Sequence, residues 1–496
     1  VKDRSLSFEG VYVLAQQPTM SNVAFNVYPL KDKEFDDFRN GTLELRCVSM
    51  KLEQQGTDRP EIYSGPGYIR QNNLEGFHFV LFAQEIVSES SSIEKLMRSM
   101  SIPSGQIIPE SELFALTAKD DKGRVWETKD ILISVNSHNG TVTVCTGVIE
   151  EITTRLSPRG KNSREGMLMC IFDEFKLPYN TKTITRIRAG KKRSFSGTLN
   201  ALSFTALGNS FFMQNQEKTL LVQASSTPDT QLPPYFETRI LETLQFLLAQ
   251  PLDWSFLVKH KKEEVTCSLR SRKRKNPKSR IHSPVEINFA EEKAFCKLFR
   301  KYLQHIIKFE GPNLHPLSAQ MRAICYASAS FINTEALILS VAVESIVKDM
   351  EETDSKLSDE DKKWIVKARE YFNTWNGHHE ISNRITGLFG MINNNSVSGR
   401  LDMLAKAKAI TAQQKSSWSR LRNAAAHGDS LSSVPLQELL LLCNEVLVLF
   451  YHIVFYQIRY SGEYLNYAKL GWPKEEYIHP RIKLTRKHED LTESPD

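Results

Sequence analysis

The feature that most constrains the fold is a change in the spacing of apolar residues about halfway along the chain. Up to about residue 225, short apolar runs alternate with polar residues, as in FHFVLFAQEI from Phe77 and ILISVNSHNGTVTVCTGVI from Ile131. Alternation with a period of two is typical of β-strands that bury one face. From Glu286 onward, apolar residues recur every three or four positions, as helices require. The sequence therefore predicts an α+β protein, with a β-rich N-terminal region followed by an all-α helical bundle.

The same change divides the chain into four segments. We expect residues 1–225 to form the β-rich region, with a tight hairpin turn at Asn139-Gly140. Residues 226–284 predict one helix, starting at Tyr235, followed by a basic linker. Residues 285–470 predict the helical domain, and residues 471–496 a polar C-terminal tail. A chain of 496 residues is long enough for more than one hydrophobic core.

The composition limits the class of protein. Charged residues make up 25% and apolar residues 41% of the chain, which is ordinary for a globular protein. The seven cysteines are dispersed and none forms a C-x-x-C pair, so we expect reduced thiols in a cytoplasmic protein and no zinc site. The first ten residues, VKDRSLSFEG, lack the apolar core of an export signal. We predict neither a metal nor a cofactor.

One segment, Leu436–Ile458, is long and apolar enough to span a bilayer. Asn444 and Glu445 lie near its middle, however, and a central carboxylate costs about 2.5–3.5 kcal/mol in a membrane. We therefore expect a buried helix of the bundle and no membrane partner.

The most specific polar pattern is RNAAAH, which closes a predicted helix just before Gly428. A glycine often follows the last residue of a helix, so His427 is expected at the C-terminal end. The helix dipole favours the protonated imidazole there and raises its pKa toward the range useful for proton transfer. Asn423 and His427 share a helix face, whereas Arg422 and His427 are roughly 140° apart. The pattern predicts a catalytic site formed by Arg422, Asn423 and His427.

A structural interpretation of these residues stays open, in which the arginine and the histidine only bind the last carbonyl groups of the helix. The same R-x4-H spacing recurs at Arg300 and His305, with bulky residues between them. There we expect an ordinary helix face, because no asparagine follows the arginine.

RNAAAH resembles the R-N-x-x-x-H signature of HEPN ribonucleases, all-helical domains in which the motif ends a late helix. The segment ALILSVAVESIV, which carries Glu344 in an otherwise apolar face, resembles a core helix of HEPN domains of the ApeA type. Proteins of that type serve bacterial anti-phage defence by abortive infection and carry a β-rich domain ahead of the HEPN domain. The resemblance covers about residues 285–465, and only the general layout of the N-terminal half.

The resemblance implies a metal-independent endoribonuclease in the bacterial cytoplasm, with RNA, and tRNA above all, as the substrate. A homodimer through the helical domain would form a composite site, and the N-terminal region would sense a phage-derived trigger or restrain cleavage. His427 would act as general acid or base, Arg422 would neutralise charge on the phosphate, and Asn423 would orient the phosphate or the imidazole. Glu344 would support the site by pairing with Arg422, or would instead pair with a structural arginine such as Arg384.

Two basic tracts, RIRAGKKR from Arg186 and SRKRKNPKSR from Ser271, are candidate RNA-binding segments. Neutralisation of phosphates dominates RNA binding, and the tracts contain few aromatic residues, so we expect contacts to the RNA backbone with little sequence readout. Each tract could equally be a solvated loop. The candidate residues are Lys191, Lys192, Arg193, Arg272, Lys273, Arg274 and Lys275.

A rival prediction comes from a different class of protein. In it the helical bundle dimerises without catalysis, and the β-rich region binds a ligand, so that the chain is a ligand-binding or scaffold protein.

Overall fold

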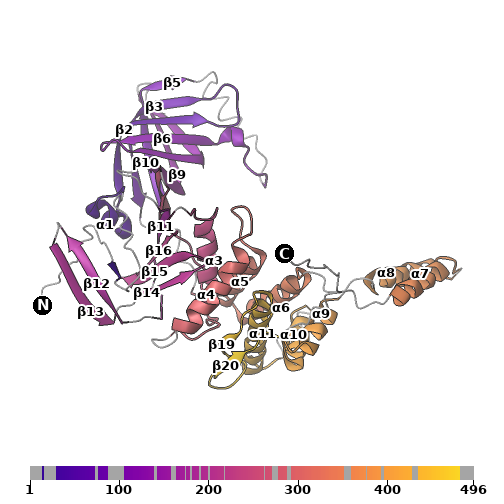
Figure 1. The fold of residues 1–496 in the computed structure, drawn as a ribbon. Helices are drawn as coiled ribbons and strands as arrows, with labels where there is room; N and C mark the ends of the chain where they lie inside the picture. Colours follow the sequence, from indigo (N-terminus) through magenta and orange to yellow (C-terminus); the bar gives the residue numbers. More distant parts are fainter. Residues whose placement is uncertain are drawn as a thin grey trace, which may run out of the picture.

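The computed structural model describes residues 14–15 and 29–480, apart from internal segments. The segments outside the description are 73–75, 88–104, 139–141, 158–163, 174, 179–180, 189–190, 199–200, 217, 229, 262, 271–277, 288–291, 351–358, 376, 393–395 and 427–433. The description of residues 181–198 covers the backbone alone. The predicted α+β class is confirmed: a large antiparallel sheet from Glu44 to Arg270 precedes a helical region (Figure 1).

In the described part of the chain, one sheet contains 15 strands, in the order β14-β15-β16-β11-β17-β18-β10-β7-β6-β2-β3-β4-β9-β8, with β5 paired to β3. Its strands are β2 (Glu44–Gln54), β3 (Ile62–Asn72), β4 (Gly76–Ala83), β5 (Glu85–Val87), β6 (Phe114–Asp120), β7 (Val125–Ile131), β8 (Ile133–His138), β9 (Val142–Ile149), β10 (Glu151–Leu156), β11 (Gly166–Ile171), β14 (Ala201–Ala206), β15 (Asn209–Gln216), β16 (Thr219–Ser225), β17 (Phe256–His260) and β18 (Val265–Arg270). A smaller sheet joins β1 (Leu14–Ala15), β12 (Thr181–Arg188) and β13 (Lys191–Thr198).

The strands expected from alternating apolar residues are confirmed. On β4, Phe77, Phe79 and Leu81 are buried, as alternate residues facing one core must be. Strands β8 and β9 pair antiparallel, with His138 opposite Val142. The predicted turn at Asn139-Gly140 lies between them, outside the described residues.

The helical region follows the predicted pattern. Its helices are α4 (Glu292–Ile306), α5 (Pro316–Ser328), α6 (Ile332–Lys348), α7 (Asp359–Asn373), α8 (His379–Ile392), α9 (Val397–Lys406), α10 (Ala412–Ala426) and α11 (Leu436–Gln457). Helices α6, α10 and α11 contact one another, α9 contacts α6 and α10, and all four share one core. Helices α7 and α8 form a hairpin that projects away from these helices (Figure 1).

The segment 226–284 differs in part from the predicted helix and linker. The helix is confirmed as α3 (Phe236–Leu248), but β17 and β18 follow it and lie inside the large sheet, between β11 and β10. Cys267 and Leu269 of β18 are fully buried. The alternating apolar residues of VTCSLR, which fit a pleated surface, decide the structure here despite the charged residues on either side.

The predicted polar tail also differs, because its first residues are structured. Strand β20 (Lys474–Tyr477) pairs with β19 (Gly462–Leu465) in a two-stranded sheet. Tyr477 is buried, and its ring centroid lies 5.0 Å from that of His452 and 5.4 Å from that of Phe455, both on α11. The short strand therefore closes one side of the helical core.

One described helix, α11, is long and apolar enough to cross a membrane, but 72% of its most apolar window is buried inside the protein. Within it, Glu445 accepts a hydrogen bond of 2.7 Å from Ser417 of α10. Burial lowers the pKa of His452 to about 4, which keeps its imidazole neutral near neutral pH. This agrees with the predicted core helix.

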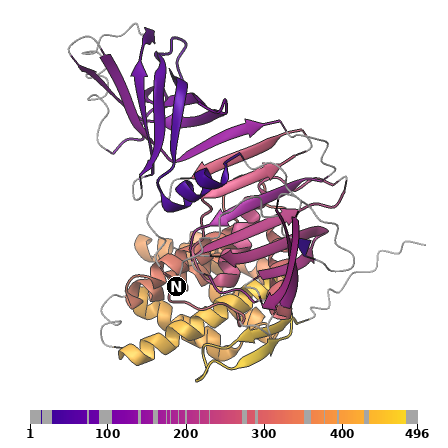
Figure 2. The ribbon, with the colours of Figure 1, turned by 90° about the vertical axis from the view of Figure 1, so that its left-hand side faces the viewer.

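Two hydrophobic cores divide the sheet. One core is formed by residues of strands β2–β10, β17 and β18. The other core joins β11 and β14–β16 to α3 and the helical region. Where the sheet meets the helices, the ring centroids of Phe204 on β14 and Phe211 on β15 lie 5.0 and 5.1 Å from that of Phe299 on α4. Strands β2–β6 extend away from the helices, while β14–β16 lie against them (Figures 1 and 2). Strands β11 and β14–β16 thus belong to the same packed unit as the helices.

Candidate functional site

The candidate site lies on α10, whose inner face packs against α6. Trp418 and Leu421 of α10 are buried, and Trp418 Nε1 donates a hydrogen bond of 3.1 Å to the carbonyl oxygen of Ser340 on α6. Arg422 lies four residues after Trp418 on α10, and Glu344 lies four residues after Ser340 on α6. The side chains of Arg422 and Glu344 form a hydrogen bond. Two contacts one turn apart therefore fix the backbone position of Arg422 through the core beneath it.

Arg422 is held by a carboxylate but stays open to solvent. Its Nε donates a hydrogen bond of 3.1 Å to Glu344 Oε2, and its guanidinium lies 5.9 Å from the ring centre of Trp418. The side chain of Arg422 is 46% exposed and that of Glu344 is 24% exposed. An exposed guanidinium with one Nε contact keeps its outer nitrogens free to bind an oxyanion.

The structure answers the question of the partner of Glu344. Its carboxylate pairs with Arg422 and with Lys348, whose Nζ lies 2.7 Å from Oε1. Arg384, the alternative partner, lies on α8 in the projecting hairpin. Hydrogen bonds from Lys348 and then from Arg422 hold the pKa of Glu344 below its usual value, although partial burial opposes this. The carboxylate is therefore charged at neutral pH.

Of the other two predicted catalytic residues, only Asn423 is described. It is exposed and directly follows Arg422 on α10. His427 comes right after Ala426, the last described residue of α10, and lies outside the described residues. The structure thus brings Arg422 and Glu344 together, while the exposed Asn423 is the next residue on α10, where successive side chains point in different directions.

Sequence reasoning missed two supports of this site. Lys348 is one, although its spacing of four residues from Glu344 is the usual signal for a helical ion pair. Arg400 of α9 is the other, and it closes the end of α6 by donating to the carbonyl oxygens of Val347 at 3.1 Å and of Met350 at 2.8 Å. An arginine that binds terminal carbonyl groups stabilises the helix end that carries Glu344.

The second R-x4-H pair behaves as an ordinary helix face. Arg300 of α4 donates a hydrogen bond of 3.1 Å to the carbonyl oxygen of Thr205 on the sheet. The ring of His305 lies 5.4 Å from that of His315, and burial lowers the pKa of His305. Both residues take part in local packing, as expected.

The structure describes most of the first basic tract, but only the last three residues of the second. Lys191, Lys192 and Arg193 begin β13, and the register pairs Arg193 with Arg186 and Lys191 with Arg188 on β12. The first tract is therefore a β-ribbon in which cationic residues stand opposite one another along the backbone. The second tract lies outside the described residues up to position 277, including Arg272, Lys273, Arg274 and Lys275.

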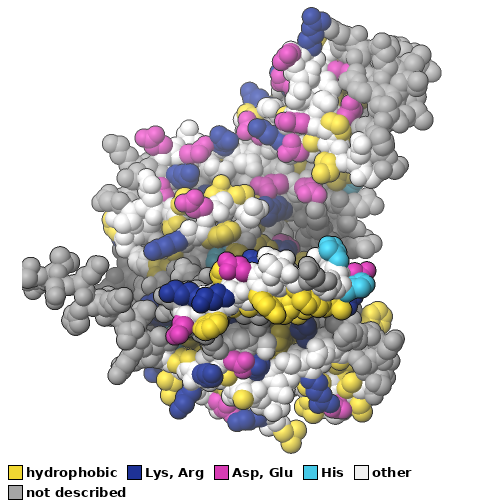
Figure 3. Space-filling view, turned by 90° about the vertical axis from the view of Figure 1, so that its right-hand side faces the viewer, with side chains coloured by type: hydrophobic (Ala, Val, Ile, Leu, Met, Phe, Trp, Pro, Cys, Tyr) yellow, Lys and Arg dark blue, Asp and Glu magenta, His cyan; other side chains and the backbone are white. Residues whose placement is uncertain are grey.

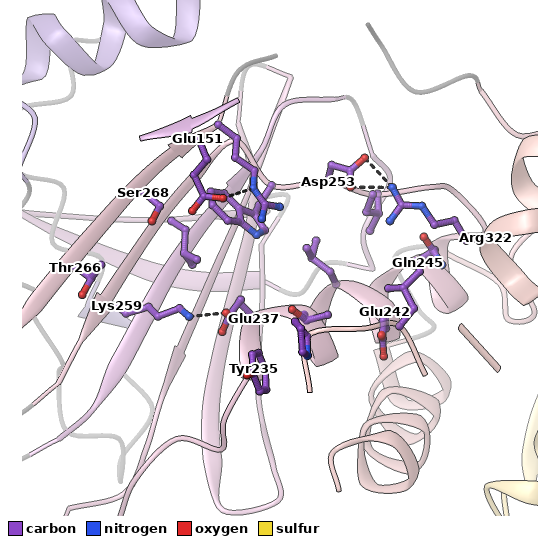
Figure 4. A pocket seen from close by; sticks show the side chains of 18 of the residues that line it. Glu151, Tyr235, Glu237, Glu242, Gln245, Asp253, Lys259, Thr266, Ser268 and Arg322 are labelled. Atoms are coloured by element: carbon purple, nitrogen blue, oxygen red, sulfur yellow. Dashed lines mark hydrogen bonds and ion pairs between the residues drawn. The ribbon is translucent and has the colours of Figure 1, made fainter. Parts of the chain in front are cut away.

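A cavity of about 490 Å³ lies between the large sheet and helices α3 and α5 (Figure 4). Its walls carry three ion pairs. Arg270 Nε lies 2.9 Å from Glu151, Arg322 Nη2 lies 2.8 Å from Asp253, and Lys259 pairs with Glu237 of α3.

One wall of the cavity combines a cation with an aromatic ring: the Arg270 guanidinium lies 3.8 Å from the ring centre of Trp254. Tyr235, just before α3, has a left-handed backbone with φ of 55°, which costs energy in a residue with a side chain. The charges of the walls neutralise each other, so a ligand here would need donor and acceptor groups together. No protein-family model matches the chain, and neither does any curated protein or solved structure.

Proposed function

We propose that this chain is a HEPN-type endoribonuclease that acts as an abortive-infection effector against phage and cleaves RNA, with tRNA as the expected substrate. The observation that carries the proposal is the exposed Arg422, held by Glu344 in the last turns of α10, with the exposed Asn423 as the next residue of the helix. A fixed cation and an amide in solvent are the groups that recognition of a phosphate requires.

The proposed chemistry needs no metal. The ribose 2′-oxygen attacks the adjacent phosphorus and loses its proton to a base, while the bond from phosphorus to the 5′-oxygen breaks and that oxygen takes up a proton. The products are a 2′,3′-cyclic phosphate and a free 5′-hydroxyl end. His427 serves as general acid or base, Arg422 stabilises the charge on the phosphoryl oxygens, and Asn423 orients the phosphate or the imidazole.

The proposed active form is a homodimer through the helical region in the bacterial cytoplasm, with RNA reaching residues of both copies. In this proposal the N-terminal region senses a phage-derived trigger or restrains cleavage. The shared core of β11, β14–β16 and the helices supports such a role, because a rearrangement in that part of the sheet must disturb the packing of the helices.

The test compares the wild type with His427→Ala, and uses His305→Ala as a control because it alters the other R-x4-H pair. We expect growth arrest and RNA cleavage for the wild type and the control, and loss of both for His427→Ala, with cyclic-phosphate ends on the wild-type products. Arrest and cleavage that persist in His427→Ala would refute the proposed mechanism. Intact RNA in cells that express the wild type would favour the rival ligand-binding protein.

A further inference from the structure

The cavity between the large sheet and helices α3 and α5 has polar walls where a helix packed on a sheet normally buries apolar residues. On β18, successive side chains point to opposite faces of the sheet. Leu269 points into the core of the N-terminal strands, whereas Ser268 and Arg270 line the cavity. On α3, Gln245 also lines the cavity, although it is only 2% exposed. A hollow of about 490 Å³ with polar groups in its walls is typical of a small-molecule site.

Two arginines meet at the Asp253-Trp254 dipeptide. Arg322 of α5 donates from Nη2 to both carboxylate oxygens of Asp253, at 2.8 and 3.0 Å. The guanidinium of Arg270 lies 3.8 Å from the ring centre of Trp254, and its Nε donates to Glu151 at 2.9 Å. Figure 4 shows Glu151 and Asp253, the acidic partners of the two arginines, along the same side of the cavity. Because Asp253 and Trp254 are consecutive residues, the two guanidinium groups are held in one part of the cavity.

Each arginine keeps hydrogen-bond donors that its ion pair does not use. Within the described part of the chain, Nη1 and Nη2 of Arg270 have no hydrogen-bond partner, and the same holds for Nε and Nη1 of Arg322. The side chains are 41% and 26% exposed, so both are partly shielded from water. A planar guanidinium binds carboxylates and phosphates through parallel N–H groups. The two arginines therefore suit the binding of an oxyanion.

The acidic side chains of the cavity limit the charge of that oxyanion. Four carboxylates line the cavity, those of Glu151, Glu237, Glu242 and Asp253, and each forms an ion pair with a basic side chain. A nucleoside triphosphate would bring several negative charges close to these carboxylates, whereas a single carboxylate brings one. Among the described side chains on the face seen in Figure 3, acidic and basic groups are likewise interspersed, a mixture that does not steer a polyanion toward the molecule.

One of these carboxylates is also available to a positively charged group. Glu237 of α3 accepts from Lys259 with Oε1, and its Oε2 has no partner among the described residues. Figure 4 shows Glu237 apart from Glu151 and Asp253, on the α3 side of the cavity. The cavity thus offers donors for an anionic group in one part and an acceptor for a cationic group in another.

We propose that this cavity binds a small zwitterion, a free α-amino acid or a dipeptide. The carboxylate of the ligand binds the unused N–H groups of Arg270 and Arg322, and its ammonium group binds Glu237. The rest of the ligand lies against Leu241 and Leu257, which form an apolar part of the lining. This binding function goes beyond RNA cleavage and does not depend on it.

The first experiment is calorimetric titration of the purified full-length protein with the standard amino acids and their glycyl dipeptides. We expect at least one of them to bind with a dissociation constant below about 1 mM. Its carboxamide and its N-acetyl derivative each lack one of the two charges and should bind at least about tenfold more weakly. A panel without such a binder overturns the proposal, as does equal binding of the derivatives. Adenosine monophosphate is the phosphate probe, and tighter binding of this probe than of every zwitterion also overturns the proposal.

The second experiment changes the two arginines. Arg270→Lys and Arg322→Lys keep the positive charge but remove the planar fork, so each should weaken binding at least about tenfold. Arg155→Lys is the matched control and should bind like the wild type. Arg155 also lies on β10 and pairs with Glu127 at 3.9 Å, but it is outside the cavity, about 13 Å along the strand from Glu151.

Cavity variants that bind like the wild type overturn the proposal, and so does a control variant that loses as much affinity as they do. The comparison of ligand derivatives uses only the wild type, so it decides the matter even where a variant fails to fold.

Discussion

Replacing Glu344 by glutamine tests how the cation of the site is held. The substitution keeps the size of the side chain but removes its charge. Glu344 accepts from Arg422 at 3.1 Å and from Lys348 at 2.7 Å, and the neutral amide attracts neither cation. Arg422 should then sample more orientations, because Trp418 beneath it gives only a loose ring contact of 5.9 Å.

The size of the effect follows from the exposure of the pair. With 46% of the Arg422 side chain and 24% of the Glu344 side chain in solvent, water screens the attraction. Such pairs contribute about 0.2–1 kcal/mol, so the free energy of unfolding should fall by less than about 1 kcal/mol. If the transition state loses the same interaction energy of about 1 kcal/mol, Glu344→Gln should slow cleavage about fivefold. Arg422→Ala should slow cleavage about 100-fold or more.

The assay is single-turnover cleavage of tRNA by the purified variants, together with urea unfolding. Lys348→Met is the control, because it removes the other ion pair of Glu344 and leaves Arg422 in place; its cleavage rate should stay within about twofold of the wild type. Because the pKa of Glu344 is lowered in the folded protein, the ion pair contributes to the free energy of unfolding above the ordinary carboxyl pKa of about 4.3. This contribution is lost as the pH falls through the lowered pKa. Equal cleavage by the wild type and Glu344→Gln, beside an inactive Arg422→Ala, would show that the carboxylate does not position the arginine.

Two further predictions concern the N-terminal half. Burial opposes ionisation of Glu34, but hydrogen bonds from Arg124 and Lys122 lower its pKa from 4.5 to about 2. Glu34→Gln should therefore lower the unfolding free energy by up to about 3 kcal/mol at pH 7, a difference that shrinks as the pH falls from about 4.5 to 2; a difference in urea unfolding that does not change over this range contradicts the assignment. Charge reversal in the basic β-ribbon should weaken RNA binding and reduce the slope of log affinity against log salt by about 2, and an unchanged slope in binding titrations would remove the ribbon from the RNA site. The reversed residues are Lys191, Lys192 and Arg193.

Local patterns in the sequence predict much of the fold. Alternating residues around Phe77 and the helical spacing after Tyr235 suffice for β4 and α3, because each pattern is long and has few charged residues within it. Strands β17 and β18 were missed because each is only five or six residues long and lies among basic residues. The alternation of Val265, Cys267 and Leu269 was the signal that could have revealed β18.

The candidate site was predictable in its residues but not in its contacts. The motif itself names Arg422 and Asn423, and the structure shows both exposed on α10. The choice between Arg422 and Arg384 as the partner of Glu344 depends on how α6 and α10 pack, which no local pattern encodes.

The core that runs from β11 and β14–β16 into the helices makes the helical region inseparable from this part of the sheet. A C-terminal fragment that begins near residue 225 or 285 would lack Phe204 and Phe211, which pack against Phe299. The apolar residues of the shared core would then be exposed to water. We expect such a fragment to aggregate, because it exposes a large apolar surface. Under the proposed function, proteolytic removal of the N-terminal region would therefore not release a folded helical region, and activation would take place within the intact chain.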